Sequence, residues 1–224
     1  MIVINMFFLD FEDKLEAIHN DKNKFLLSGK NIDGNFNKKL ADYEKKEKKE
    51  LTKIYSKLTP WQIVKIARHS SRPKSSDYIN LIFSDFTYLS GDRLFSEDNS
   101  ILSGIGRIDN QSFLVLGNEK GRDMETRIKH NFGMAKPEGY RKCQRIMELA
   151  EKFQLPLLCF IDTSGAFPGK EAEERGQAEA IAKSMQVSLN IETPSIAIVI
   201  GEGGSGGAIA LGTCDKVLML SNSI

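Results

Sequence analysis

The sequence predicts an α/β fold with a parallel sheet, preceded by a helical N-terminal part. Short apolar runs end in glycine-rich turns, and amphipathic segments of helical period lie between those runs. By contrast, the first 58 or so residues are polar and lysine-rich. Strands that alternate with helices are typical of parallel sheets with right-handed crossovers. The alternation by itself is equally compatible with a doubly wound sheet.

Composition limits the classes of function. The chain has 224 residues, with 31 Lys and Arg against 30 Asp and Glu, so the net charge is +1. This balance gives no general attraction to nucleic acid or to an anionic membrane. Cys143, Cys159 and Cys214 form no C-x-x-C pair. We therefore expect neither a zinc ribbon nor a disulfide framework, and a reducing, cytosolic setting fits.

The first residues do not resemble a targeting segment. Residues 1–9 are apolar, but no basic residues precede them, and Asp10 and Glu12 follow at once. A secretory signal needs a basic start and a cleavage site of small residues. Elsewhere no apolar run approaches the roughly 20 residues of a membrane-spanning helix.

The N-terminal part predicts helices. Residues 38–58 carry apolar side chains on one helical stripe, which indicates an amphipathic helix. The lysines of residues 45–50 are interleaved with glutamates, which favours a solvated helix face over a nucleic-acid patch. Thr59 and Pro60 predict the N-cap and first position of a short helix that ends near Arg68.

A hairpin and a long helix begin the α/β part. Residues 101–108 and 112–117 alternate like strands around a polar turn at residues 109–111, and this pattern predicts a β-hairpin. Pro137 is placed to open a helix that continues through Phe153 with one apolar face.

Two glycine-rich turns follow consecutive buried strands. The remaining predicted elements are a strand at 155–161, a helix at about 172–185, strands at 195–200 and 216–220, and a helix start after the second turn. The turns at residues 162–169 and 201–208 both leave the carboxyl end of a strand, which is where α/β sheets place ligands. We therefore expect the two turns to form a site.

Several motifs fit the second turn. Residues 201–206 match the dinucleotide pattern G-x-G-x-x-G, but residues 221–224 provide no acid at the required distance. No lysine follows for a phosphate-binding P-loop. Residues 203–207 match G-x-S-x-G, but every histidine precedes Ser205, so the order of a hydrolase triad is wrong. A plain glycine turn remains, beside a pair of backbone amides that form an oxyanion hole.

Longer blocks carry a family resemblance. The blocks, in chain order, are residues 8–12, 61–63, 67–69, 72–73, 91–93, 121–122, 131–134, 137–142, 161–169, 172–177 and 199–208. Together they resemble the carboxyltransferase alpha subunits of acetyl-coenzyme A carboxylase from bacteria and plastids. The resemblance runs from about Met6 to the last residue. Ordered blocks of this kind are far more specific than a single glycine pattern.

The resemblance implies both fold and reaction. It implies a crotonase-like (ClpP/crotonase) spiral of ββα units at residues 91–224, after an N-terminal helical extension at residues 1–90. The implied reaction moves the carboxyl group from carboxybiotin to acetyl-CoA. Its product is malonyl-CoA, in the first committed step of fatty-acid synthesis.

The resemblance also implies partners. These are a beta subunit, typically in an assembly of two alpha and two beta subunits, the biotin carboxyl carrier protein and an ATP-consuming biotin carboxylase. Biotin is attached to the carrier protein, and the beta subunit carries the zinc ribbon, so no metal is expected on this chain. The implied location is the cytoplasm, or the stroma in a plastid-bearing source. Neither membrane nor nucleic acid is an expected partner.

The resemblance assigns site residues to the two turns. Gly206 and Gly207 match the amides that stabilise negative charge on the ureido oxygen of biotin, while the beta subunit holds the thioester. No titrating protein base is required. The further candidates for lining the substrate pocket are Gly165, Ala166, Gly204 and Ser205.

Some positions depart from the family pattern. Ser164 stands where relatives often have Pro or Lys, and Phe167 where Tyr is usual, so Phe167 is given no polar role. Relatives continue beyond Ile224, from which we expect a fragment or a C-terminally truncated product. Two alternatives stay open: a carboxyltransferase or decarboxylase for another acyl-CoA, and an inactive fragment that still binds a partner. Because the resemblance places the thioester half-site on the beta subunit, the chain alone is expected to be inactive.

Overall fold

The computed structural model describes residues 7–28 and 34–224. The chain divides into two compact units, one that ends at Ile66 and one that spans Ala67–Ile224. The boundary predicted between residues 90 and 91 stays a prediction. Residues 1–6 of the apolar N-terminal segment lie outside the described residues.

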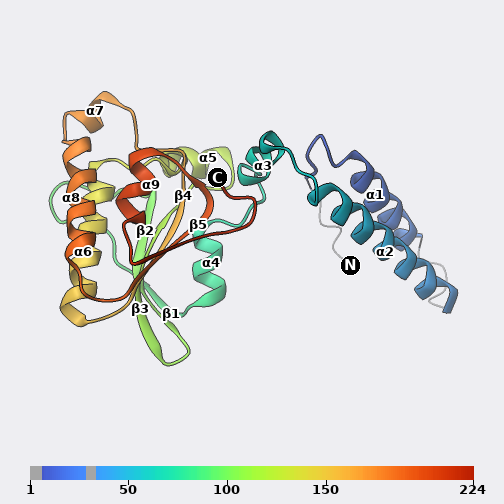
Figure 1. The fold of residues 1–224 in the computed structure, drawn as a ribbon, viewed down its shortest axis with the longest axis horizontal. Coiled ribbons are helices and arrows are strands. Elements are labelled where there is room, and N and C mark those ends of the chain that lie inside the picture. Colours follow the sequence, from blue (N-terminus) through green and yellow to red (C-terminus); the bar gives the residue numbers. More distant parts are fainter. Residues whose placement is uncertain (1–6, 29–33) are drawn as a thin grey trace. The chain divides into compact units, whose positions relative to one another are not determined.

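The first unit contains a helical hairpin (Figure 1). Its helices are α1 (Asp13–Leu27) and α2 (Gly34–Tyr55), followed by the short α3 (Pro60–Ala67). The ring of Phe25 stacks on Phe36 with 4.8 Å between centroids. Glu47 of α2 pairs with Lys22 of α1. The predicted cap of α3 is confirmed, because the N–H of Gln62 donates to Thr59 Oγ1 at 3.3 Å.

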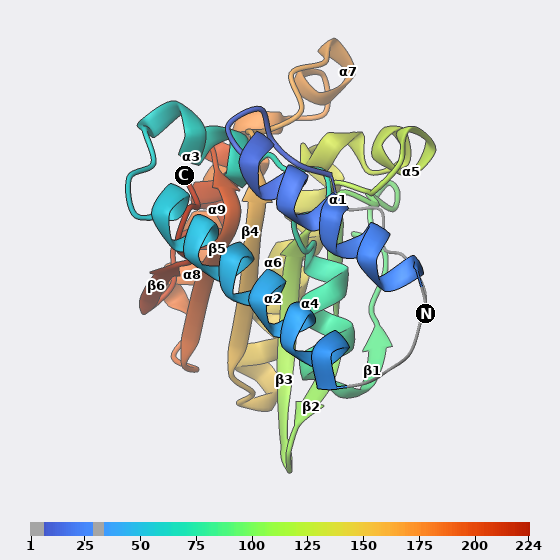
Figure 2. The same cartoon turned by 90° about the vertical axis from the view of Figure 1, so that its right-hand side faces the viewer.

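The second unit is built on a six-stranded sheet (Figures 1 and 2). The strands are β1 (Ser84–Tyr88), β2 (Ile101–Ile108), β3 (Gln111–Asn118), β4 (Leu157–Thr163), β5 (Ser195–Gly203) and β6 (Lys216–Met219). The pairs β1–β2 and β2–β3 are antiparallel, and all later pairs are parallel. The predicted hairpin is therefore confirmed.

Strand order separates two folds that the sequence pattern leaves open. The strands follow one another across the sheet in chain order from β1 to β6. A doubly wound sheet reverses its direction of growth at a switch point. This sheet grows in one direction only, as a spiral of repeating units does.

Helices cover both faces of the sheet. On one face lie α6 (Pro137–Phe153), α8 (Gln177–Asn190) and α9 (Ser205–Gly212), while α4 (Ser75–Ile82) lies on the other. Side chains such as Met147 and Ala180 form the larger core with Ile161 of β4. A smaller core joins Ile79 of α4 to Phe160 and Ile200. The long helix α6 begins and ends at the predicted residues.

The helix predicted at about 172–185 is in fact two helices. The short α7 (Lys170–Glu173) is separated from α8 by Gly176, which has φ +80°. A right-handed helix cannot continue through that backbone conformation. Two other short elements, α5 (Met124–Lys129) and the 3-10 turn η1 (Asn131–Gly133), connect β3 to α6.

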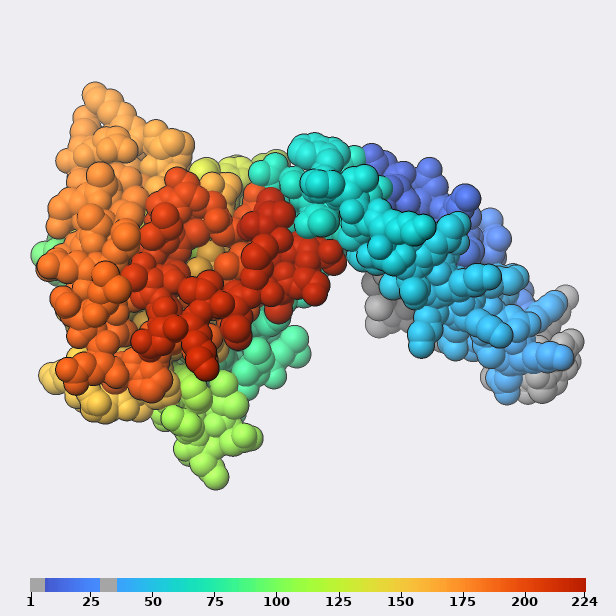
Figure 3. All heavy atoms as spheres, viewed as in Figure 1, coloured from blue at the N-terminus to red at the C-terminus, as the bar shows by residue number. Residues whose placement is uncertain are grey.

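The last strand forms an open edge of the sheet. Residues Val217, Leu218 and Met219 of β6 are each more than half exposed. Figure 3 shows the C-terminal segment, coloured red, at the surface of this unit. In the described parts of the chain, β6 has a hydrogen-bonded strand only on its β5 side.

Candidate functional site

The two glycine turns meet at the carboxyl ends of β4 and β5. The N–H of Gly204 donates to the carbonyl oxygen of Thr163 at 2.9 Å. A Cβ built on Gly165 lies 3.5 Å from Cβ of Ser205. The structure thus brings together the turns that the sequence places after consecutive strands.

Two of the glycines leave no space for a side chain. A Cβ on Gly207 would lie 2.7 Å from the carbonyl carbon of Gly165 and 3.0 Å from the nitrogen of Ala166. A Cβ on Gly204 would lie 2.6 Å from the carbonyl carbon of Ser164. Each glycine therefore allows one backbone to approach another closely. Gly206 differs, because its Cβ would meet only the Ile181 side chain, at an ordinary 3.5 Å.

The start of α9 presents unpaired backbone donors. The first bond within the helix runs from the N–H of Ala208 to the oxygen of Gly204, at 3.1 Å. The N–H groups of Ser205, Gly206 and Gly207 have no acceptor among residues 7–28 and 34–224. Free N–H groups at a helix start carry partial positive charge and attract anions.

Backbone strain accompanies these donors. Ser205 has φ +55°, a left-handed conformation that costs a non-glycine residue about 1–2 kcal/mol. Gly165 in the facing turn has φ +154°. The chain therefore passes from strand to helix through a sharp bend that sets the direction of the first amides of α9.

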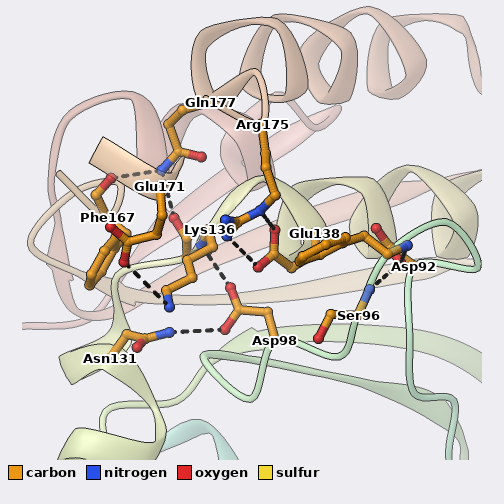
Figure 4. Close-up of polar contacts among 12 residues, drawn as sticks. Asp92, Ser96, Asp98, Asn131, Lys136, Glu138, Phe167, Glu171, Arg175 and Gln177 are labelled. Carbon is orange, nitrogen blue, oxygen red and sulfur yellow. Dashed lines mark hydrogen bonds and ion pairs between the residues drawn. The ribbon is translucent and has the colours of Figure 1, made fainter. Parts of the chain in front are cut away.

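The first turn is held by two side chains that the sequence analysis gave no role. Thr163 Oγ1 donates to the Gly165 oxygen at 2.8 Å and accepts the Gly165 N–H at 3.1 Å. The amide of Gln177 donates to the carbonyl oxygens of Ala135 and Phe167, at 2.9 and 3.0 Å. Figure 4 shows Gln177 reaching Phe167. The only sequence signal for the role of Gln177 was its place directly after a glycine, Gly176. The structure shows that this glycine is left-handed.

An ion pair next to the turn ties the connection between α7 and α8 to α6. The guanidinium of Arg175 donates to both carboxylate oxygens of Glu138, at 3.2 and 2.9 Å (Figure 4). The same guanidinium lies 4.8 Å from the ring centroid of Phe95. The ring of Phe167 lies 4.7 Å from Lys136 Nζ, so this ring, which lacks a hydroxyl, takes part in a cation–π contact. Arg175 thus has structural partners within its own unit.

A second polar cluster occupies the strand ends on the α4 side. Lys120 Nζ lies 2.8 Å from Asp162 Oδ1 and 2.6 Å from Glu202 Oε2. Arg68 Nε lies 2.8 Å from the other oxygen of Glu202. Burial alone would raise the pKa of Glu202, but its bonds to Lys120 and Arg68 hold that pKa below the usual range. Sequence patterns gave no sign of this cluster, because its members are far apart in the chain.

The described residues contain neither a metal-binding cluster nor a membrane-spanning helix. No group of three or more His, Cys, Asp or Glu within residues 7–28 and 34–224 is placed to hold a metal ion. The thiols of Cys143, Cys159 and Cys214 are free. Of the helices in those same ranges, none has the length and apolar character to cross a bilayer.

Known proteins match this chain closely in sequence. The family model described as "Acetyl co-enzyme A carboxylase carboxyltransferase-like" matches residues 8–224. The carboxyl transferase alpha subunit of Gluconacetobacter diazotrophicus is 52% identical over 217 residues, covering 97% of this chain and 68% of the relative. The alpha subunit of Rhodospirillum centenum is 50% identical over 221 residues, covering 98% and 69%.

Solved structures agree in fold. A transcarboxylase 12S crystal structure with hydrolysed methylmalonyl-coenzyme A bound has a TM-score of 0.57 at 18% identity, covering 67% of this chain and 28% of that chain. A single-chain, multi-domain long-chain acyl-CoA carboxylase has a TM-score of 0.54 at 20% identity, covering 67% and 15%. At these identities the similarity establishes the fold alone.

Proposed function

Because the chain belongs to the family of acetyl-CoA carboxylase carboxyltransferase alpha subunits, we propose that its two glycine turns form the carboxybiotin half of a shared active site. Alpha subunits of this family work with a beta subunit to move a carboxyl group onto acetyl-CoA. The second unit has the crotonase-like fold of such carboxyltransferases.

The observation that carries the proposal is the set of unpaired amides at the start of α9. Bound carboxybiotin supplies an activated carboxyl group, and loss of that group leaves negative charge on the ureido oxygen. The residues fit this group, since Gly206 and Gly207 offer adjacent N–H donors that have no acceptor within the described residues. One such donor is typically worth about 2.7–4 kcal/mol of transition-state stabilisation.

The neighbouring positions shape the pocket. Gly204 allows the close approach of the two turns, and Gly165 and Ala166 contribute the backbone that Gly207 contacts. Ser205 lies at the strained bend before the donors. We assign Gly165, Ala166, Gly204 and Ser205 to the walls of the carboxybiotin pocket. The residues of this chain bind and orient the group, and no side chain of the two turns has to accept a proton.

The partners follow from the family. We propose that the thioester half of the site lies on a beta subunit, in an assembly of two alpha and two beta subunits. A biotin carboxyl carrier protein brings biotin that a biotin carboxylase has loaded with ATP. The location that fits this assembly is the cytoplasm, or the stroma of a plastid. The chain without its beta subunit is therefore expected to be inactive.

A substitution at Gly207 tests the assigned half-site. Gly207→Val would push the first turn away from α9, because even a Cβ at this position would lie 2.7 Å from the Gly165 carbonyl carbon. With a beta subunit present, we expect kcat for malonyl-CoA formation to fall about 100-fold or more, with little change in KM for acetyl-CoA.

The matched control for this test lies on the same helix. Ile209 is 51% exposed, so Ile209→Ala removes apolar volume without touching the turns and should keep nearly full activity. Wild-type kcat in the Gly207→Val enzyme, at equal assembly with the beta subunit, would show that these amides do not serve the reaction.

A further inference from the structure

A cavity of about 180 Å³ lies at the carboxyl ends of the central strands. It is on the α4 side of the sheet, because Lys74, which lines it, is the N-cap residue of α4. α4 packs on that face through Ile79 and Phe160. Gly207 and Ala208 belong to α9, which covers the opposite face. Ser164 of the first turn lines the cavity, so the two sites are neighbours.

The charged lining of the cavity is mostly cationic. Its charged residues, apart from a histidine, are Arg68, Lys74, Lys120, Arg127, Asp162 and Glu202. The two carboxylates are already paired with Lys120 and Arg68. Two positive charges, those of Lys74 and Arg127, therefore remain without a carboxylate.

Lys74 is the residue that points to a ligand. It is only 7% exposed. Its ammonium group forms no ion pair or hydrogen bond within residues 7–28 and 34–224. Burial is the largest cause and lowers the pKa of Lys74; the carboxylates of Asp162 and Glu119 oppose this shift, while Lys120 and Arg127 add to it. A cation is seldom buried without a partner, so the missing partner is best supplied by an anion in the cavity.

The second cation without a carboxylate partner is Arg127, which also lines the cavity. Arg127 of α5 is half-buried, and its guanidinium lies 5.9 Å from the ring centroid of Phe132. No carboxylate within the described residues pairs with it. A guanidinium presents a planar fork of donors that matches phosphate oxygens.

We propose that this cavity binds a phosphate group, held between Lys74 and Arg127 with Lys120 at its base. The two surplus positive charges match a phosphate monoester, which carries about −1.5 to −2 at neutral pH, better than they match a single carboxylate. The group comes either from free inorganic phosphate or from a phosphorylated small molecule such as the 3′-phosphate of coenzyme A. This proposal is independent of the role of Gly206 and Gly207.

Titration of the 224-residue chain with inorganic phosphate, in chloride buffer near pH 7, tests the proposal by calorimetry. We expect saturable binding at one site, weakened about tenfold or more in Lys74→Met, since hydrogen bonds to charged groups are worth that much. The control is Lys183→Met, because the Lys183 side chain is exposed and bonds only to Gln186 in the described parts of the chain. Arg127→Met removes the other unpaired cation of the cavity. It gives a second measurement of phosphate affinity if Lys74→Met does not fold.

Absence of saturable phosphate binding would overturn the proposal, as would equal affinity in the wild type and the Lys74 and Arg127 variants. Coenzyme A and dephospho-coenzyme A distinguish the two sources. Tighter binding of coenzyme A, with competition by phosphate, identifies the 3′-phosphate as the occupant. Equal or absent binding of both nucleotides, with phosphate still bound, identifies the free ion.

Discussion

At the scale of single residues, Asp98 shows how burial and hydrogen bonding compete. It is 3% exposed, and its carboxylate accepts the N–H groups of Ser100 and Lys136 at 2.9 and 2.7 Å. Asn131 donates to it at 3.3 Å (Figure 4). Burial raises the pKa of Asp98 by more than these donors lower it. The folded protein therefore holds the Asp98 proton more tightly than the unfolded chain does.

A pH dependence follows from that sign. An acid with a raised folded-state pKa contributes stability below its unfolded pKa of about 3.9, and this contribution is lost as pH rises through the folded value. Asp98→Asn cannot titrate at this position. We expect the free energy of unfolding, wild type minus Asp98→Asn, to decrease between about pH 4 and pH 7 in urea denaturation. A difference that stays constant or grows with pH would contradict the raised pKa.

Single residues also mark the limit of sequence reasoning about the site. The glycines of both turns could be found, because strand, turn and helix are local patterns. Gln177 could not be given its role, because that role depends on the carbonyl oxygens of Ala135 and Phe167, which only the fold brings near. The cluster around Lys120 was missed for the same reason.

At the scale of elements, the chain turns a sharp corner between α7 and α8, and a single glycine makes that corner possible. Gly176 has φ +80° and precedes the first residue of α8, Gln177. A helical pattern of apolar residues continues across this position, so the sequence suggests one helix where there are two. The corner places Gln177 against the first turn and Arg175 against Glu138 of α6.

Gly176→Ala tests this corner. Alanine in a left-handed conformation costs about 1–2 kcal/mol, although nothing crowds its Cβ, whose nearest neighbour would be Glu179 at 3.9 Å. We expect the free energy of unfolding to fall by that amount, which lowers the urea midpoint while the m-value stays unchanged. Gly206→Ala is a useful comparison for stability, because its φ is not positive and its Cβ has space. Equal stability of wild type and Gly176→Ala would argue against the left-handed corner.

At the scale of the whole molecule, the local pattern fixed the kinds of elements but not their arrangement. The hairpin, α6 and the parallel strands could be predicted from periodicity and capping residues. The order of strands from β1 to β6 could not, because alternating strands and helices fit a doubly wound sheet equally well. Only long-range pairing and the family resemblance separate these folds.

The division into two compact units leads to a prediction of independent folding. The unit from Ala67 to Ile224 has its own sheet and both hydrophobic cores. We expect a chain that lacks residues 1–66 to keep a cooperative urea transition and the near-ultraviolet circular dichroism of Tyr140, which is fully buried. A broad transition without near-ultraviolet signal would show that the first unit is needed for the second to fold.

The contact of Gly207 with the first turn has a consequence for the energetics of turnover. The backbones of α9 and of residues Gly165 and Ala166 touch without intervening side chains. The direction of the donors is therefore fixed when the protein folds, and no reorientation is needed when charge develops. Under the proposed function, the entropy of aligning the donors is lost once per folding event rather than once per catalytic cycle.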